Sequence, residues 1–429
     1  MTTREHPRMF FGNFVNELMV ATPTARHAKA LVAVSPRKVW LTQPGDVVVL
    51  PTAPSEPLWE YACDLLGFAR SSVTSVAAPS EDLITLTDAV RKNGLTGHLR
   101  ALAEAAPGLR FQPFALDRPA LDLAAELGLP VDGYADGRPS DAAVEAVYRI
   151  NTKPGFRDVA AELGIRTAAG RVAADRGELL TAVRDTVAAH GGAVVKPVRG
   201  SNGYGVRFLS EEDLPGLEAL LDSYLADVSD QPSGWVVEQR LDLARVVTVE
   251  MEVTDAGPQV LHVGEMRTPN GSFSGQVTPL EENSPAVDRL TADGLTLGRH
   301  LDRIGYRGPF DIDGGITGDG QLFATESNLR RTGATYLDLL VRRFLGTEGA
   351  ARAVWLADSR PGGVTPDFAA GLGLVRDAGL AFEPGAAEGV VLTADTLAFD
   401  GKWRYLVMGT SHRRVEEIEK RLADVLRLA

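Results

Sequence analysis

The segment that most constrains this chain is residues 194–206, VVKPVRGSNGYGV, in which a glycine-rich loop follows an apolar run. Gly200, Gly203 and Gly205 lack a Cβ, so the loop can turn tightly and bring backbone N–H groups close to an anion. Lys196 adds a positive charge at the same place. The pattern is typical of a loop that holds nucleotide phosphates. Its Asn-Gly pair also predicts an ordinary hairpin turn, so this segment alone leaves both interpretations open.

A second segment, residues 307–332, predicts two strands joined by a Gly-Asp-Gly turn. Side chains alternate between faces in a strand, so Asp311 and Asp313 share one face, and Glu326 and Asn328 share a face of the returning strand. Such oxygens suit Mg²⁺ that is also bound by phosphate, because close carboxylates repel unless a cation lies among them. The alternative is the solvated face of a half-exposed hairpin. The upstream lysine and glycine loop favour the metal site.

The order of these segments resembles the ATP-grasp superfamily over roughly residues 150–346. In that family a lysine precedes a helix and a second lysine ends a strand before a glycine loop. A glutamate then opens the hinge that contacts adenine, and an Asp…Glu-x-Asn set binds magnesium. Lys153 in NTKPGFRDVAAELGI matches the first lysine, Lys196 matches the second, and WVVEQRL at 235–241 matches the hinge.

The resemblance implies a role for each matching residue. The residues implied to bind ATP are Lys153, Lys196, Arg199, Gly200, Ser201, Asn202, Gly203, Tyr204, Gly205, Glu238, Gln239 and Leu241. The implied magnesium ligands are Asp313, Glu326 and Asn328, with Asp311 as a supporting group behind them. Arg330 is implied to stabilise the transferring phosphoryl group or the tetrahedral intermediate.

One position departs from the family pattern. Family members often carry an acidic residue before the Thr-Val that follows the hinge, where it holds the ribose hydroxyls. Here the chain reads Val246-Val247-Thr248-Val249, which leaves Asp242 or Glu250 as candidates for that contact.

Residues 267–276, RTPNGSFSGQ, are too polar and glycine-rich for a core element, and two interpretations of them remain open. In the first they form a substrate loop, and Arg267 joins Arg330 among the catalytic residues by making paired hydrogen bonds to a carboxylate. In the second they form an exposed hairpin tip, and Arg267 simply pairs with Glu265 on the same strand face.

Further segments narrow the resemblance to the pheganomycin-type peptide ligases. They are FFGNFVNELM at 10–19, the GSNGYGV loop, ESNLRRTGATY at 326–336 and an appended C-terminal segment. The implied fold class is α/β (α+β), an ATP-grasp fold. It comprises an N-terminal Rossmann-like pre-ATP-grasp domain with its linker at 1–150, an ATP-grasp domain at 151–346 and a small C-terminal α/β extension at 347–429.

The residues themselves agree with the first of these domains. Apolar runs alternate with helix-like segments between residues 10 and 105, which predicts a small α/β domain with a parallel sheet. No Gly-x-Gly-x-x-Gly follows an early strand, and no Gly-Lys-Ser/Thr loop is present, so dinucleotide binding and a P-loop are disfavoured.

The resemblance implies an ATP-dependent carboxylate–amine ligase that works through an acyl phosphate, with ATP and Mg²⁺ as cofactors. Its partners would be a small carboxylic acid or amino acid and an amino acid or peptide amine, in peptide natural-product biosynthesis. A homodimer is a further expectation from the family. Two alternatives stay open: a nucleotide-binding regulatory module without ligation, and a small-molecule kinase that stops after phosphorylation.

Composition excludes several other classes. The net charge of −13 argues against general nucleic-acid binding, which needs an excess of Lys and Arg. The single cysteine, Cys63, excludes an internal disulfide and is expected in a helical core. The seven histidines have no cysteine partners, so a zinc site is not expected. No membrane-spanning or signal-like segment is recognised, so a cytoplasmic location is expected.

Overall fold

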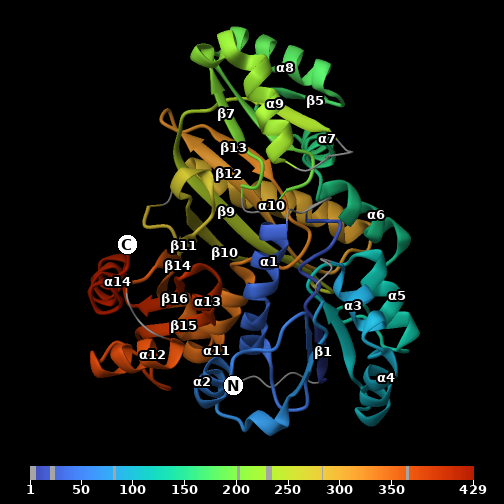
Figure 1. Cartoon of the computed structure of the whole chain (residues 1–429), viewed down its shortest axis with the longest axis vertical. Helices are drawn as coiled ribbons and strands as arrows, with labels where there is room; N and C mark the ends of the chain where they lie inside the picture. Colours follow the sequence, from blue (N-terminus) through green and yellow to red (C-terminus); the bar gives the residue numbers. More distant parts are fainter. Residues whose placement is uncertain are drawn as a thin grey trace.

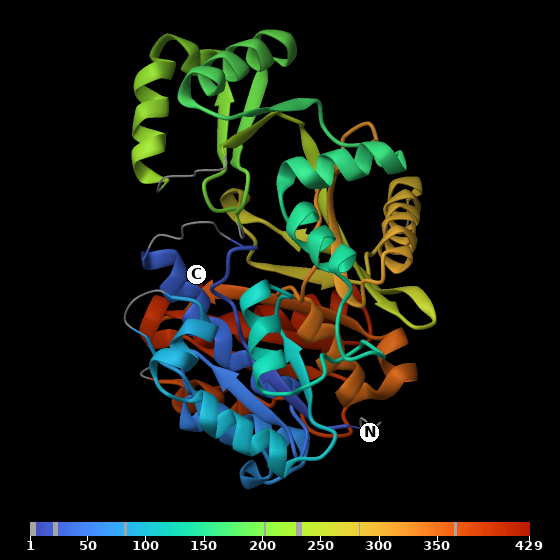
Figure 2. The same cartoon turned by 90° about the vertical axis from the view of Figure 1, so that its right-hand side faces the viewer.

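The computed structural model describes residues 6–19, 25–80, 84–200, 203–228, 234–282, 284–363 and 367–429. Figures 1 and 2 show a large lower body, in which the N-terminal and C-terminal parts of the chain lie side by side, and a smaller upper lobe. The described part of the chain contains no helix that is both long and apolar enough to cross a bilayer.

The N-terminal region is a layered α/β unit. Four of the described strands form a parallel sheet in the order β3-β2-β1-β4, as predicted. The strands are β1 (Arg8–Phe11), β2 (Val47–Leu50), β3 (Thr74–Ala77) and β4 (Arg110–Pro113). The helices are α1 (Ala25–Val34), η1 (Ser35–Leu41), α2 (Glu56–Leu66), η2 (Arg70–Ser72), α3 (Leu86–Lys92), α4 (Thr96–Ala105), α5 (Arg118–Glu126) and α6 (Asp141–Ile150). Strand β2 is buried along its whole length because helices cover both faces of the sheet. Cys63 is buried in α2, as expected.

The upper lobe has its own sheet and its own core. The helix α7 (Lys153–Leu163) leads into it, and its described strands form an antiparallel sheet in the order β5-β8-β6-β7. These elements are β5 (Gly170–Ala173), α8 (Arg176–His190), β6 (Gly192–Pro197), β7 (Arg207–Ser210), η3 (Glu211–Gly216), α9 (Leu217–Asp227) and β8 (Trp235–Gln239). Its buried apolar residues form a cluster separate from the rest of the molecule.

The centre of the molecule is an antiparallel sheet. Among the described residues its strand order is β13-β12-β9-β10-β11-β14-β16-β15. The strands are β9 (Leu243–Thr254), β10 (Gly257–Arg267), β11 (Gly275–Thr278), β12 (Gly308–Thr317), β13 (Leu322–Glu326), β14 (Val354–Pro361), β15 (Gly389–Asp395) and β16 (Lys402–Gly409). The helices are η4 (Pro269–Gly271), α10 (Pro285–Arg303), α11 (Thr335–Arg352), α12 (Phe368–Asp377), α13 (Leu397–Asp400) and α14 (His412–Leu426).

The C-terminal strands continue this central sheet instead of forming a sheet of their own. Strand β14 pairs with β11, and β16 and β15 follow it. One large core spans the N-terminal unit and strands β9 and β12, while a second joins the other face of the N-terminal unit to the C-terminal strands. Trp40 of η1 donates a hydrogen bond of 2.9 Å to the carbonyl of Thr393 in β15, which fixes this second contact. The predicted boundaries at 150 and 346 remain predictions.

The predicted strand-turn-strand at 307–332 is present as β12 and β13, but it is not a half-exposed hairpin. Strand β12 lies between β9 and β13, and most of its residues are buried, including Asp311 at 3% exposure. The solvated-face alternative is therefore wrong, because β9 supplies a second neighbour that the local sequence does not reveal.

Candidate nucleotide and metal site

The first lysine is fixed at the start of a capped helix. Thr152 caps α7, Lys153 is its first residue, and Gly164 ends it in the left-handed conformation. The Lys153 backbone N–H donates to the carbonyl of Val198, which ties this helix to the strand end before the glycine loop. The buried Lys153 Nζ lies 3.3 Å from Glu326 Oε2.

The second lysine and the hinge glutamate meet inside the upper lobe. Lys196 lies on β6 and Glu238 on the neighbouring β8, and Lys196 Nζ is 2.6 Å from Glu238 Oε2. Arg157 Nη1 donates to the other Glu238 oxygen at 2.7 Å. Burial raises the pKa of Glu238, but Lys196 and Arg157 outweigh burial and hold it below its ordinary value. Arg157 was not identified from the sequence, although it lies one helical turn after Lys153.

The acidic residues of β12 and β13 form a layered arrangement. Asp313 is paired with Glu326 across the hairpin. Behind them, Asp311 accepts a hydrogen bond of 2.7 Å from the Asn328 backbone N–H, and both its oxygens accept from the Asn328 side chain at 3.0 Å. Asn328 Oδ1 in turn accepts from Arg330 Nη2 at 2.6 Å. Asp311 therefore orients the Asn328 amide, which is what a supporting group would do.

The carboxylates of this cluster are close enough to repel one another, and nearby positive charges stabilise them. Burial raises the pKa of Asp313 well above its ordinary value, and the nearby carboxylates of Asp311 and Glu326 raise it further. Burial also raises the pKa of Glu326, but Lys153 and Lys196 more than offset this effect. Both ammonium groups therefore act on the same carboxylate, although they come from different elements.

The residues present fit a hard divalent cation. Carboxylate and amide oxygens are the ligands that Mg²⁺ prefers, and a cation between Asp313 and Glu326 would relieve their mutual repulsion. His, Cys, Asp and Glu alone do not form a metal-binding group of three anywhere in the described ranges. The predicted site therefore depends on the Asn328 oxygen as its third protein ligand.

The glycine loop is described on both sides of Ser201 and Asn202, which lie outside the described residues. Gly203 has φ +73°, and a Cβ there would lie 2.7 Å from the carbonyl oxygen of Gly271. Gly205 has φ +70°, and a Cβ there would lie 2.6 Å from Pro197 Cγ. Glycine is thus required at these two positions by both conformation and space.

The other loop residues turn toward the N-terminal unit. Gly200 lies beside the first lysine, since its Cβ position would be 4.0 Å from Lys153 Nζ. Arg199 donates to the carbonyl of Tyr148 in α6 at 3.1 Å, and burial lowers its pKa. The Tyr204 ring lies 4.9 Å from the ring of His27 in α1. The loop therefore bridges the upper lobe and the lower body.

The hinge lies at the end of β8. The Gln239 backbone N–H donates to Ala169 at 2.8 Å, and Leu241 and the exposed Asp242 follow the strand. Glu250 is buried farther along β9 and accepts hydrogen bonds from the Thr332 and Thr335 hydroxyls. Each of its oxygens accepts one of these hydrogen bonds, and Asp242 and Glu250 both stay candidates for the ribose contact.

Arg267 is engaged by the C-terminal part of the chain. Its Nη1 donates to Asp358 at 2.8 Å and to Glu419 at 2.6 Å, and its Nη2 donates to the second Glu419 oxygen at 3.0 Å. The suggested pairing with Glu265 is wrong, because Glu265 pairs with Arg245. The addition of β14 to the sheet and the packing of α14 on it bring these acids to Arg267. This arrangement disfavours Arg267 as a ligand of a substrate carboxylate.

Comparisons with known proteins agree with this architecture. A family model described as the pre ATP-grasp domain matches residues 35–129, and one described as the PGM1 C-terminal domain matches residues 372–422. Over 163 residues the chain is 28% identical to the L-propargylglycine–L-glutamate ligase of Streptantibioticus cattleyicolor. That match covers 36% of this chain and spans 30% of the length of the ligase.

Solved structures resemble the whole chain. An ADP complex of N5-carboxyaminoimidazole ribonucleotide synthetase has a TM-score of 0.59 at 15% identity, covering 100% of both chains. Biotin carboxylase from Campylobacter jejuni has a TM-score of 0.63 at 13% identity, covering 99% of this chain and 92% of that one. The chain shares the overall fold of these structures, and residues 35–129 match the pre ATP-grasp domain, as the sequence resemblance implied. Over part of its length it is also similar to the Streptantibioticus cattleyicolor ligase.

Proposed function

We propose that this chain is an ATP-dependent carboxylate–amine ligase that forms an amide bond and releases ADP and phosphate. The observation that carries the proposal is that Lys153 lies 3.3 Å from Glu326, beside Asp313 and Arg330, while the charge of Lys196 also lowers the pKa of Glu326. Two ammonium groups and a guanidinium around buried acids supply the mixed charge that phosphoryl transfer with a divalent cation needs.

Each residue has a definite task in this mechanism. Asp313, Glu326 and Asn328 would hold Mg²⁺, which neutralises phosphate charge when bound. Lys153 and Lys196 bind the phosphate oxygens, so their present carboxylate partners give way to ATP. The substrate carboxylate attacks the γ-phosphoryl group in line, which yields an acyl phosphate and ADP. The amine then attacks the acyl carbon, and phosphate leaves.

The loop and the arginine complete the mechanism. The glycine loop at 200–205 covers the phosphates and excludes water, which would otherwise hydrolyse the acyl phosphate. Arg330 stabilises the negative charge that develops on the transferring group or on the tetrahedral intermediate. Glu238, with Gln239 and Leu241, receives the adenine ring at the hinge.

We further propose that the acid is a small carboxylic acid or amino acid and that the amine is an amino acid or peptide. The name of the Streptantibioticus cattleyicolor ligase gives two amino acids as its substrates, which supports this choice. A role in peptide natural-product biosynthesis and a homodimeric assembly belong to the same proposal.

The test is an incubation of the full chain with ATP, Mg²⁺ and pairs from a panel of acids and amines, with ADP and phosphate measured and products weighed by mass spectrometry. An amide-linked adduct that forms only when both substrates are present supports the ligase. A phosphorylated product without an adduct identifies a kinase. Nucleotide binding with no product from any pair identifies a regulatory module, and either of these results overturns the proposal.

A further inference from the structure

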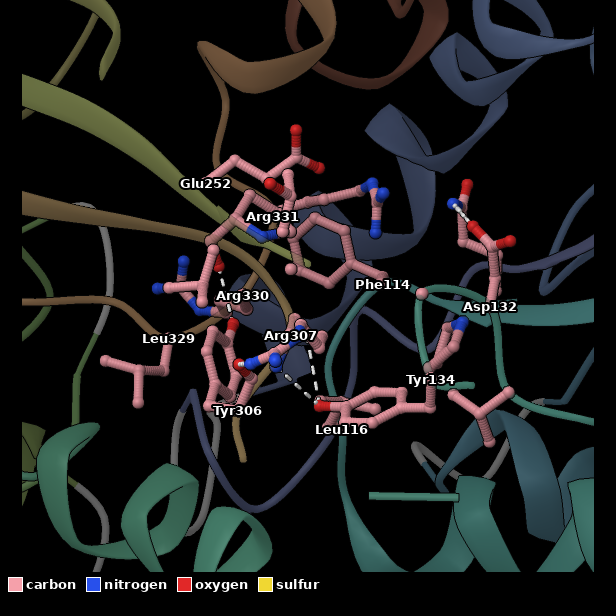
Figure 3. A pocket seen from close by; sticks show the side chains of 18 of the residues that line it. Phe114, Leu116, Asp132, Tyr134, Glu252, Tyr306, Arg307, Leu329, Arg330 and Arg331 are labelled. Carbon is pink, nitrogen blue, oxygen red and sulfur yellow. Dashed lines mark hydrogen bonds between the residues drawn. The ribbon is translucent and has the colours of Figure 1, made fainter. Parts of the chain in front are cut away.

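A cavity of about 230 Å³ lies between the N-terminal unit and the end of the central sheet (Figure 3). Its walls come from the segments that follow β4, the carboxyl end of β9, the turn that enters β12 and residues 329–331. Segments of the N-terminal unit and of the central sheet thus enclose one space. None of the magnesium ligands implied from the sequence lines it.

Most charges around this cavity already have partners. Asp132 is bound by Arg8 at 2.9 Å and by Gln112 at 2.8 Å, and Arg307 is bound to Asp255 at 3.1 Å. These pairs hold the two sides of the cavity in place and leave little charge to offer a ligand. The side chains of Phe114, Leu116 and Tyr134 also line the cavity, beside these polar groups (Figure 3).

Glu252 is the exception among the acids of this wall. It is half-buried, and its side chain makes no hydrogen bond or ion pair within the residues that the structure describes. Figure 3 shows Glu252 and Arg331 at the same end of the cavity, beside the ring of Phe114. A carboxylate and a guanidinium therefore face the same space next to an apolar surface.

The cavity is separate from the predicted metal ligands but adjacent to them. Glu252 and Thr248 share a face of β9, and Thr248 lies opposite Asp313, so the two ends are roughly 13 Å apart along the strand. Arg330 lies between them, because it lines the cavity and also donates to Asn328. A molecule in the cavity would thus contact a residue of the proposed catalytic site.

We propose that this cavity binds a free α-amino acid as its zwitterion. An α-amino acid carries an ammonium and a carboxylate on the same carbon, which matches Glu252 and Arg331 at one end of the space. Its side chain would lie against Phe114, Leu116 and Tyr134. The cavity is smaller than the 300–1,000 Å³ or so of pockets for drug-sized ligands, which suits a single amino acid.

Occupation of the cavity is coupled to the nucleotide site through Arg330. An amino acid that contacts Arg330 changes the position of the Arg330 guanidinium, which lies beside Asn328 and the acidic cluster. Coupling of this kind is reciprocal, so the amino acid and Mg-ADP alter each other's binding by the same factor.

The test is isothermal titration of the full chain, without nucleotide, against each of the twenty L-amino acids and their N-acetyl and carboxamide derivatives. We expect at least one free amino acid to bind and both of its derivatives to bind at least tenfold more weakly. The Glu252→Gln variant should bind it at least tenfold more weakly and should no longer discriminate against the N-acetyl form. The Arg331→Gln variant should no longer discriminate against the carboxamide.

Glu104→Gln removes an exposed carboxylate from α4 and should bind like the wild type, so it controls for net charge. Circular dichroism checks that each variant is folded. If Glu252→Gln does not fold, Glu252→Asp keeps the charge at a shorter reach and should show weakened binding with the N-acetyl discrimination retained. The inference is overturned if no amino acid binds more tightly than about 1 mM, or if Glu252→Gln binds as well as the wild type. The titration contains no ATP, so its outcome is independent of the ligase proposal.

Discussion

Arg330 is buried, so its positive charge depends on the acidic side chains around it. Burial lowers the pKa of its guanidinium, while Asp311, Glu326 and Asp313 act in the opposite direction and keep it charged. Its Nη2 donates to Asn328, and its Nε has no hydrogen-bond partner among the described residues. A donor that is held rigidly with spare hydrogen-bonding capacity is suited to a charge that develops only in a transition state.

Arg330→Ala should retain nucleotide binding and lose most turnover. Removal of one positioned donor typically costs about 3–4 kcal/mol, roughly a hundredfold to a thousandfold in rate. Steady-state kcat and calorimetric binding of Mg-ADP separate the two effects, with Arg330→Lys expected to recover part of kcat. Arg413→Ala removes an exposed arginine from α14 and is the matched control. Unchanged turnover in Arg330→Ala would exclude this residue from the mechanism.

His262 predicts a pH dependence of stability. It is buried on β10, and burial, with a smaller effect of Arg342, lowers its pKa to about 3. Its folded-state pKa lies below the unfolded value of about 6.5, so the unfolded chain takes up a proton first as the pH falls. The stability that neutral His262 provides is therefore present above pH 6.5 and is lost progressively between 6.5 and 3. The limiting slope is about 1.4 kcal/mol per pH unit.

Denaturant unfolding at several pH values between 7 and 4 measures this slope. His262→Asn should flatten the curve in this range by close to one proton, whatever its effect on stability at pH 7. Asp338 lies 3.8 Å from His262 and titrates in both proteins, so it does not enter the difference. His98→Asn, on the exposed face of α4, should leave the slope unchanged. Equal slopes for His262→Asn and the wild type would contradict the prediction.

At the scale of elements, the backbone of the glycine loop contacts the backbone of the segment after β10. The Gly203 backbone approaches Gly271 so closely that a methyl group cannot enter. Strand β10 ends at Arg267, which is bound to Glu419 of the C-terminal helix α14. The loop that is proposed to cover the phosphates therefore contacts a segment, at Gly271, that α14 holds in place. Packing of the C-terminal part therefore reaches the proposed site through the contact between Gly203 and Gly271.

Gly203→Ala should raise the KM for ATP several-fold with little change in melting temperature. The left-handed conformation costs a non-glycine residue about 1 kcal/mol, and the clash with Gly271 displaces the loop further. Gly216→Ala is the control, because its φ is negative and its Cβ would meet nothing within 4 Å. An unaltered KM for ATP in Gly203→Ala would argue against a role of this loop in covering the phosphates.

Arg267→Ala should destabilise the protein by about 3 kcal/mol, because it leaves Glu419 and Asp358 buried without their cation. Arg245→Ala breaks the more exposed pair with Glu265 in the same sheet and should cost no more than about 1 kcal/mol. Denaturant unfolding measures both values. A raised KM for the carboxylate substrate with unchanged stability would instead restore Arg267 as a substrate ligand.

At the scale of the whole molecule, the features that the sequence predicts are those that local patterns along the chain determine. The lysine before the glycine loop and the β12–β13 hairpin follow from patterns within single segments, and the parallel N-terminal sheet follows from the alternation of apolar runs and helix-like segments between residues 10 and 105. The pairs that shape the site do not. Arg157 with Glu238 and Arg267 with Glu419 are 81 and 152 residues apart, and no local pattern indicates that their elements become neighbours.

The burial of Asp311 illustrates the same limit. Alternation along β12 places its side chain on one face, but only the pairing of β12 with β9 determines that this face is covered. The hinge glutamate is similar, since Lys196 can reach Glu238 only after β6 and β8 have paired, and Arg157 approaches Glu238 from the separate helix α7. Local patterns therefore indicate candidate residues, but the contacts between them depend on tertiary pairing.

The hydrogen-bonded pairing of β14 with β11 has a practical consequence for anyone who divides this protein into pieces. A fragment that stops near residue 346 would leave β11 with a bare row of amide and carbonyl groups where β14 now binds. Open edges of that kind recruit other chains, so such a fragment should aggregate rather than behave as a soluble catalytic core. Functional dissection should instead rely on point substitutions within the intact polypeptide.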